Sequence, residues 1–349
     1  MAPPSPGVTE GKFYERLANG QVRCDVCPHR CEIEPDNAGL CDVRRNQNGT
    51  LVLNTSARGV IAHADPIEKK PFYHFRPGTR CWSIGVPGCN MDCPYCINWE
   101  LSQPARPGPA NSTAWMSPAE IVSQAENHAC ESIAFTYTEP AVFFEYVLET
   151  AQLAKPRGLS LVMKTNGFIS HDPLAELTPY LDAANVDLKS FRETTYRKLG
   201  GHFQTVLETL RTIRAAGVWL EVTTLIVPGM NDSADELSAI ARFLADELDG
   251  VAWHILRFFP GYRMTESTPT PMDTLNRALD IGRAAGLSHV YLSNLRVSET
   301  RNTHCPDCGH AVITRSGTTT LCQALSNGRC QHCHRKIIGT WNSNQLSEG

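Results

Sequence analysis

The chain has 349 residues, of which 42% are hydrophobic and 19% are charged, and its formal net charge is −4. This composition is that of an ordinary globular protein, so it excludes a wholly disordered chain, and the charge argues against a chain-wide nucleic-acid or membrane surface. The sequence shows no secretory signal pattern and no apolar run of membrane-spanning length, so we expect a cytoplasmic protein.

Fourteen cysteines are the main departure from average composition, and eleven of them fall into three groups. In a reducing compartment, closely spaced thiols indicate metal sites rather than disulfides. The first group has the spacing C-x2-C-x3-C-x9-C and consists of Cys24, Cys27, Cys31 and Cys41. This spacing suits a zinc ion or an auxiliary iron–sulfur cluster, which spacing hardly separates, and of the two we favour zinc. We interpret the three ungrouped cysteines, Cys81, Cys130 and Cys322, as buried apolar residues.

Between about residues 82 and 294, short β-branched runs alternate with amphipathic helical stretches. One helix has a recognisable start, a capping box of Ser117 and Glu120 with Pro118 between them, and Gly158 and Gly286 end two others. This alternation predicts a parallel sheet covered by helices, either open or closed into a full or partial barrel. The predicted strands are 82–86, 132–137, 159–164, 184–188, 218–227, 252–258 and 289–293, and the predicted helices are 121–128, 140–154, 233–248 and 272–285.

The second cysteine group directly follows the first of these predicted strands. Cys89, Cys93 and Cys96 have the spacing C-x3-C-x2-C, and they lie on a loop at a strand's carboxyl end, where parallel α/β folds place ligands and catalysis. Three thiolates hold three irons of a [4Fe–4S] cubane, and without a fourth cysteine in the motif one iron stays open to a substrate or cofactor. The alternative is a zinc knuckle with a distant fourth ligand.

The third group consists of two CxxC pairs separated by twenty-one residues: Cys305, Cys308, Cys330 and Cys333. Four thiolates at this spacing predict a tetrahedral structural zinc site, with rubredoxin-like iron as the competing metal.

The loop of residues 85–96 resembles the cluster-binding loop of the radical S-adenosylmethionine (SAM) superfamily, and Tyr95 before the third cysteine is similar as well. The resemblance implies a [4Fe–4S] cluster on Cys89, Cys93 and Cys96, SAM as cofactor, and an α/β fold with a partial (β/α)6 TIM-like barrel. It also implies cofactor contacts at successive strand ends, with Asp-x-Lys and histidine positions similar to those of glycyl-radical-enzyme activases: Tyr95, Glu139, Asn166, Asp187, Lys189 and His254. Two positions depart from the pattern, because Tyr137-Thr138 replaces a Gly-Gly pair and Thr223 falls where activases usually have arginine.

Over nearly the whole chain the sequence is similar to the AmmeMemoRadiSam subfamily of radical SAM enzymes. The similarity lies in residues 39–44, 65–75, 137–140, 187–189 and 253–260 and in the paired CxxC motifs. We therefore expect a Cys-rich N-terminal segment over 1–75, the barrel over 76–300 and a zinc-ribbon-like module over 301–349.

The resemblance implies an oxidoreductase of the pyruvate formate-lyase activating enzyme type, in which reductive cleavage of SAM gives a 5′-deoxyadenosyl radical. That radical abstracts hydrogen from an unidentified substrate, either a protein glycine or a small molecule or peptide. An electron donor such as flavodoxin or ferredoxin is the expected partner. The alternative is a non-catalytic zinc-binding adaptor in which all three cysteine groups are structural.

The segment 65–75 mixes charged side chains with proline and aromatic anchors. This mixture is typical of a lid that excludes water from an active site. We predict that it covers the open mouth of the barrel, with Lys70 and His74 facing the cavity.

Overall fold

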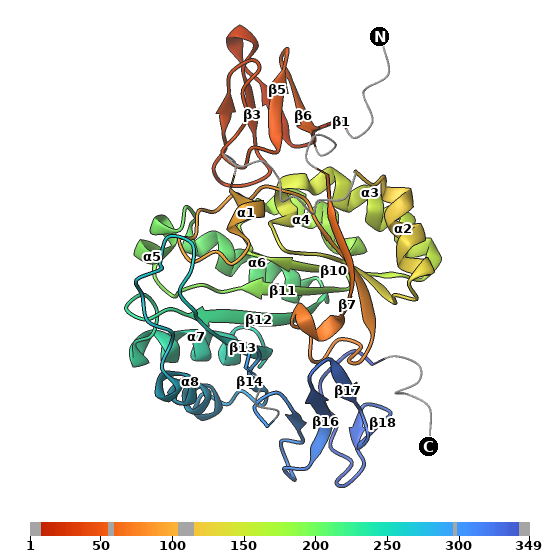
Figure 1. Cartoon of the computed structure of the whole chain (residues 1–349), viewed down its shortest axis with the longest axis vertical. Helices are drawn as coiled ribbons and strands as arrows, with labels where there is room; N and C mark the ends of the chain where they lie inside the picture. The colour runs from red at the N-terminus through yellow and green to blue at the C-terminus, as the bar shows by residue number, and fades with distance from the viewer. Residues whose placement is uncertain (1–7, 55–58, 104–114, 296–298, 342–349) are drawn as a thin grey trace.

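A computed structural model describes residues 8–54, 59–103, 115–295 and 299–341. Its centre is an eight-stranded sheet in the order β14-β13-β12-β11-β10-β9-β8-β7 (Figure 1). Neighbouring strands from β8 to β14 are parallel, and β7 pairs with β8 antiparallel. The strands are β7 (Ile61–Pro66), β8 (Arg80–Gly85), β9 (Ser132–Phe135), β10 (Ser160–Thr165), β11 (Ala183–Asp187), β12 (Trp219–Ile226), β13 (Ala252–Arg257) and β14 (Val290–Leu292). The predicted α/β fold with a parallel barrel-like sheet is confirmed. The sheet begins at Ile61, inside the range 1–75 assigned to the N-terminal segment.

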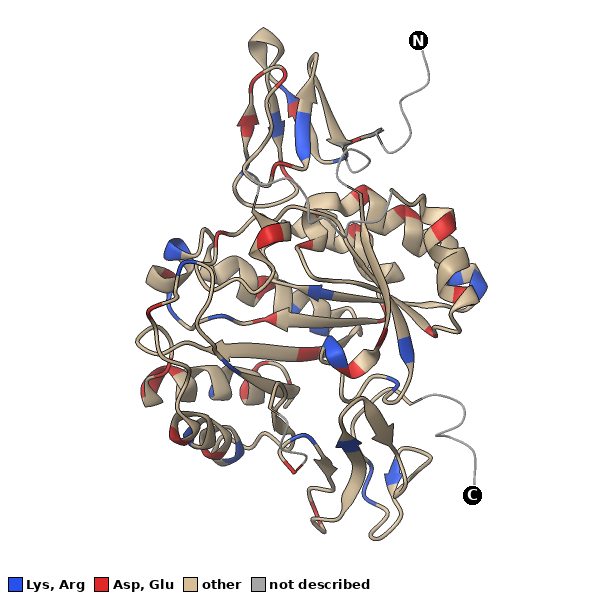
Figure 2. Cartoon of the chain, in the orientation of Figure 1, with Lys and Arg blue, Asp and Glu red and all other residues tan. Residues whose placement is uncertain are grey.

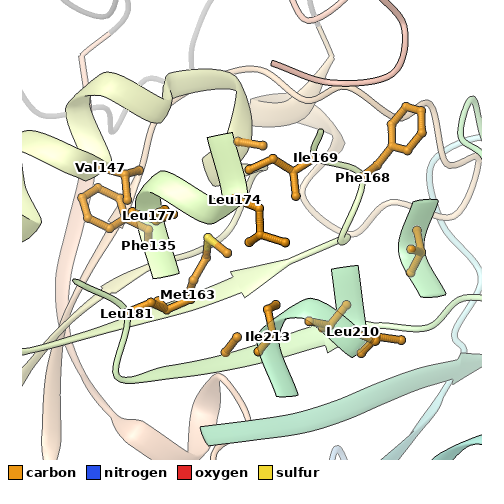
Figure 3. Packing of buried hydrophobic residues seen from close by; sticks show 14 of the residues in the cluster. Phe135, Val147, Met163, Phe168, Ile169, Leu174, Leu177, Leu181, Leu210 and Ile213 are labelled. Carbon is orange, nitrogen blue, oxygen red and sulfur yellow. The ribbon is translucent and has the colours of Figure 1, made fainter. Parts of the chain in front are cut away.

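Helices cover the outer face of this sheet. They are α2 (Pro118–Asn127), α3 (Phe144–Ala154), α4 (His171–Leu177), α5 (Glu193–Lys198), α6 (Phe203–Ala215), α7 (Ala234–Asp246) and α8 (Met272–Ala284). The short helix α1 (Trp99–Ser102) instead follows the cysteine loop at the mouth of the barrel. The predicted capping box begins α2, with Glu120 N donating to Ser117 Oγ and Ser117 N donating to Glu120. Figure 3 shows Phe135 and Met163 of the sheet packed against Val147, Leu174 and Ile213 of the helices. Burial of these apolar faces holds the helices on the sheet.

The side chains on the other face of the sheet point into the barrel, because side chains alternate between the two faces along a strand. Ala134, Val162 and Ala183 lie level with one another on β9, β10 and β11, and they pack against Ile67, Phe72 and Phe75. We call residues 67–75, which begin with the 3-10 helix η2 (Ile67–Lys69), the plug. The plug closes the barrel at the amino ends of the strands.

Small β modules lie at the two ends of the molecule in Figure 1. The N-terminal module, residues 8–54, contains β1 (Val8–Glu10), β2 (Tyr14–Arg16), β3 (Val22–Cys24), β4 (Glu32–Ile33), β5 (Arg44–Gln47) and β6 (Thr50–Asn54). The C-terminal module, residues 303–341, contains β15 (Thr303–His304), β16 (Ala311–Ser316), β17 (Thr319–Leu321), β18 (Leu325–Ser326) and β19 (Arg329–Cys330).

Each module is joined to the barrel by buried polar contacts. Arg44 of the N-terminal module makes a two-pronged ion pair with Glu145 of α3, at 2.8 and 2.9 Å. Arg315 of the C-terminal module donates to the carbonyl oxygen of Tyr73 in the plug at 2.7 Å.

Basic and acidic residues are interspersed along the ribbon in Figure 2. No helix in the described ranges is long and apolar enough to cross a membrane.

Candidate active site

A cavity of about 320 Å³ opens at the carboxyl ends of the barrel strands. Its walls come from the loop after β8 and from the ends of β9 to β13. All the predicted cluster and cofactor residues except His254 line it: Cys89, Cys93, Tyr95, Cys96, Glu139, Asn166, Asp187 and Lys189. Residues up to 100 positions apart in the sequence therefore share one chamber, because parallel strands end at the same edge.

The loop after β8 is held tightly against the N-terminal module. Gly88 has a φ of +125°, and a Cβ there would lie 2.7 Å from the carbonyl oxygen of Cys41 and 2.3 Å from a methyl group of Val43. Only glycine, which has no Cβ, can lie this close to Cys41 and Val43. On the barrel side, the Asn90 side chain donates to the carbonyl oxygen of Phe168 at 2.6 Å. The loop thus contacts both the N-terminal module and the barrel.

Hydrogen-bond donors surround the cysteine sulfurs. The Asn166 amide lies 3.7 Å and the Met91 backbone N–H 3.4 Å from Cys89 Sγ, and Cys96 Sγ lies 3.3 Å from Ser102 Oγ. Burial raises the pKa of Cys93 to about 11 and that of Cys89 well above its ordinary value. A metal that replaces the protons relieves this penalty, and the neighbouring donors stabilise metal-bound sulfur. These residues therefore fit an iron–sulfur cluster.

Glu139 is a buried carboxylate at the end of β9 that accepts three hydrogen bonds. They come from the backbone N–H of Asn166 at 2.7 Å, Thr165 Oγ1 at 2.7 Å and the backbone N–H of Ala141 at 3.1 Å. Burial outweighs these bonds and raises the pKa of Glu139 to about 7. A carboxylate offers about four acceptor positions, so one remains for a cationic ligand in the cavity.

Asp187 lies between two lysines at the ends of β10 and β11. Its carboxylate contacts Lys164 Nζ, and it accepts from Lys189 Nζ at 3.0 Å. Burial alone would raise the pKa of Asp187, but the charges of Lys164 and Lys189 lower it to about 2. The sequence analysis missed Lys164, although its inward position follows from the period of two that also points Val162 inward.

His254, the remaining predicted cofactor contact, does not line this cavity. It is fully buried on β13, with Nε2 at 2.6 Å from Glu221 Oε2 and Nδ1 at 2.7 Å from Ser293 Oγ. The Tyr73 ring of the plug packs edge-on against it, with ring centroids 4.8 Å apart. The structure thus places His254 outside the cavity, among residues that hold the plug.

The prediction of a lid over residues 65–75 is wrong, because the plug fills the end of the barrel away from the cysteine loop. His74 is buried between the carbonyl oxygen of Ile338 and the hydroxyl of Tyr291, at 2.7 and 2.6 Å. Lys70 does reach the cavity as predicted. Proline and aromatic anchors indicate a rigid segment, but they do not say which end of a barrel it closes.

Lys70 belongs to a polar group that the sequence did not reveal. Its Nζ lies 2.7 Å from Asp65 Oδ2, and the Tyr137 hydroxyl donates to the same oxygen at 2.6 Å. Tyr137 has a φ of +70°, an uncommon conformation for an aromatic residue. Its ring packs on Gly85, where a Cβ would lie 2.9 Å from Tyr137 Cδ2. The departure from Gly-Gly at 137–138 therefore places an aromatic hydroxyl on the cavity wall.

The four C-terminal cysteines meet at one point. Their sulfurs all lie within 4.8 Å of one another, with Cys305 and Cys333 at 3.4 Å and Cys308 and Cys330 at 3.6 Å. Four thiolates at about 2.3 Å from a central zinc ion stand about 3.8 Å apart. This group therefore fits a single tetrahedral ion.

A parallel α/β barrel with a three-cysteine loop at its carboxyl end defines a class of cluster-dependent enzymes. A sequence-family model, described as the radical SAM superfamily, matches residues 83–244 of the chain. The chain is 38% identical over 332 residues to the uncharacterized protein MJ0808 of Methanocaldococcus jannaschii, covering 94% of this chain and 98% of that protein. The chain therefore belongs to the radical SAM superfamily and is a radical SAM enzyme, which implies a [4Fe–4S] cluster and SAM as cofactors.

Likeness to activating enzymes is more distant. The isethionate sulfite-lyase activating enzyme of Nitratidesulfovibrio vulgaris is 30% identical over 123 residues, which cover 34% of this chain and 39% of that enzyme. Among solved structures, a radical SAM methyltransferase from Sphaerobacter thermophilus is 13% identical with a TM-score of 0.49, covering 91% of this chain and 82% of that one.

Proposed function

We propose that Cys89, Cys93 and Cys96 hold the catalytic [4Fe–4S] cluster and that SAM binds beside it against Glu139, Asn166, Asp187 and Lys189. The observation that carries this proposal is the single cavity that all these residues line. When bound and reduced, the cluster supplies the electron that cleaves SAM to a 5′-deoxyadenosyl radical, which abstracts hydrogen from the substrate.

The protein's residues bind and orient the cofactor. Glu139 has one free acceptor position, so the methionine ammonium group of SAM would form a charge-assisted hydrogen bond with it. Such a cation would also favour the ionised carboxylate, which burial alone disfavours. The Asp187–Lys189 pair offers a carboxylate and an ammonium group to the rest of the cofactor, and Lys164 keeps Asp187 ionised. Tyr95 lines the cavity beside these groups.

The cavity is about the size of one ligand, so a substrate needs further space beside the cofactor. A groove of about 840 Å³ adjoins it and shares Cys89, Met91 and Gln103 with its walls. Stacked Trp99 and Tyr262 rings lie on the groove wall, 5.1 Å apart. This groove favours a protein glycine or a peptide as substrate, with a small molecule as the alternative. The expected electron donor is a one-electron carrier such as flavodoxin or ferredoxin.

The alternative of a zinc-binding adaptor explains the two outer cysteine groups. It does not explain why Glu139, Asp187 and Lys189 gather around three cysteines in a buried cavity.

Single Cys89→Ala, Cys93→Ala and Cys96→Ala variants test the proposal. Each should abolish dithionite-driven formation of 5′-deoxyadenosine from SAM in anaerobically reconstituted protein. Cys130→Ala, which removes a buried thiol outside the three groups, should retain it. Formation of 5′-deoxyadenosine at the wild-type rate in any of the three variants contradicts the proposal.

A further inference from the structure

The four N-terminal cysteines line one small cavity of their own. Cys24, Cys27, Cys31 and Cys41 surround a space of about 20 Å³ within which the centre of a water molecule could lie. The rest of the wall is mainly apolar and includes Val26, Ile33, Leu40 and Val142. The cavity is therefore a small pocket rich in thiols.

The spacing of these sulfurs differs from that of the C-terminal group. Among the described residues, only the C-terminal four form a group of three or more potential ligands whose atoms all lie within 4.8 Å. In a tetrahedral zinc site the sulfurs stand about 2.3 Å from the metal and close around it, which leaves no room for a water-sized sphere. In a cubane each thiolate binds a different iron, so the sulfurs stand further apart around a larger space. The N-terminal group has the wider arrangement.

A buried cation also faces this pocket. Arg44 lines the cavity and is 2% exposed, and its Nε is a buried donor with no hydrogen-bond partner among the described residues. The other guanidinium nitrogens donate to Glu145 and to the carbonyl oxygen of Lys12. An unsatisfied buried N–H is costly, and metal-bound thiolate or sulfide would accept from it.

We propose that Cys24, Cys27, Cys31 and Cys41 hold a second [4Fe–4S] cluster. With four protein ligands each iron is fully ligated, so this cluster has no open position for SAM and serves in electron transfer. The expected zinc ion therefore belongs to the C-terminal group alone.

The second cluster site adjoins the first. Asn90, next to Cys89, lines the N-terminal cavity, and its carbonyl oxygen lies 2.8 Å from His29 Nε2. The backbone of Cys41 packs directly on Gly88. One electron from a carrier protein would reduce the second cluster and pass to the first, with no bond made or broken.

The test is metal analysis and electron paramagnetic resonance of the full chain after anaerobic reconstitution with iron and sulfide. Wild-type protein should hold about eight irons and one zinc per chain. The triple variant Cys89→Ala/Cys93→Ala/Cys96→Ala leaves the N-terminal group intact, so it should retain about four irons and, on reduction, a [4Fe–4S] signal. Cys27→Ser and Cys31→Ser should each lose the second cluster and keep zinc near one, whereas Cys130→Ser should keep eight irons.

Two zinc ions and four irons in the wild type, with zinc falling to one in Cys27→Ser, would overturn the proposal in favour of a zinc site. An iron-free triple variant would overturn it as well. Because the triple variant lacks only the proposed catalytic ligands, its iron content is independent of the catalytic assignment, which 5′-deoxyadenosine formation tests.

Discussion

The carboxylate of Glu221 holds the plug in the barrel, and replacing it tests that interpretation. Oε1 accepts from the backbone N–H of His74 at 2.9 Å and from Trp219 Nε1 at 3.0 Å. Oε2 accepts from the backbone N–H of Tyr73 at 2.9 Å and lies 2.6 Å from His254 Nε2. One fully buried side chain thus joins two consecutive plug residues to β12 and β13.

Glu221→Gln leaves one acceptor oxygen in place of two. If that oxygen takes the place of Oε1, the bonds from His74 and Trp219 survive, and the new NH2 donates to His254 Nε2 after the ring changes tautomer. The backbone N–H of Tyr73 then loses its partner, which costs about 1–3 kcal/mol. Glu221→Leu leaves all four partners without an acceptor and should cost at least about 4 kcal/mol, because each buried donor left unsatisfied costs about 1–3 kcal/mol.

Urea unfolding of metal-loaded protein at pH 7, followed by tryptophan fluorescence, measures both losses. Glu208→Gln on the exposed face of α6 is the matched control and should stay within about 0.5 kcal/mol of wild type. If Glu221→Leu unfolds at the wild-type urea concentration, Glu221 does not hold the plug.

We make three further predictions, for the C-terminal cysteine group, the cofactor site and His74. Cys305→Ser should lower bound zinc and the melting temperature while iron stays near its wild-type value; iron falling in step with zinc would reassign the site. Glu139→Ala should weaken SAM binding, measured by equilibrium dialysis, more than it lowers iron content, and the reverse pattern would remove Glu139 from the cofactor site. Burial lowers the pKa of His74 to about 4 from 6.5, so its contribution to the free energy of unfolding is present above pH 6.5. About 3 kcal/mol should be lost as the pH falls towards 4, and urea midpoints that change equally with pH in His74→Gln and wild type would contradict this.

Much of the barrel was predictable because its strands carry a strong local pattern. The predicted strand 252–258 is β13 at Ala252–Arg257, and the predicted strand 82–86 is β8 at Arg80–Gly85. The edge strand β7 was missed because Ile61–Pro66 mixes histidine, aspartate and proline with few apolar residues. Edge strands tolerate such sequences because only one side of the strand is paired.

The depth of a side chain inside the barrel was not predictable. Asp187 of β11 and His254 of β13 both point inward from the two strands that flank β12, and register places Thr223 level with each of them. What separates their roles is the plug, which packs Tyr73 against His254 and leaves Asp187 on the cavity wall. That contact joins residues 181 positions apart, so no pattern in the local sequence predicts it.

The C-terminal module is attached to the barrel through the plug. Arg315 and the backbone N–H of Thr340 donate to the carbonyl oxygens of Tyr73 and His74, each at 2.7 Å. Three residues before Tyr73, Lys70 enters the cavity. The segment between them is short and includes Pro71, so a shift of Tyr73 would carry Lys70 with it. A metal ion bound by the four cysteines of the C-terminal module would therefore also help to fix the floor of the cavity, although none of these cysteines lines it.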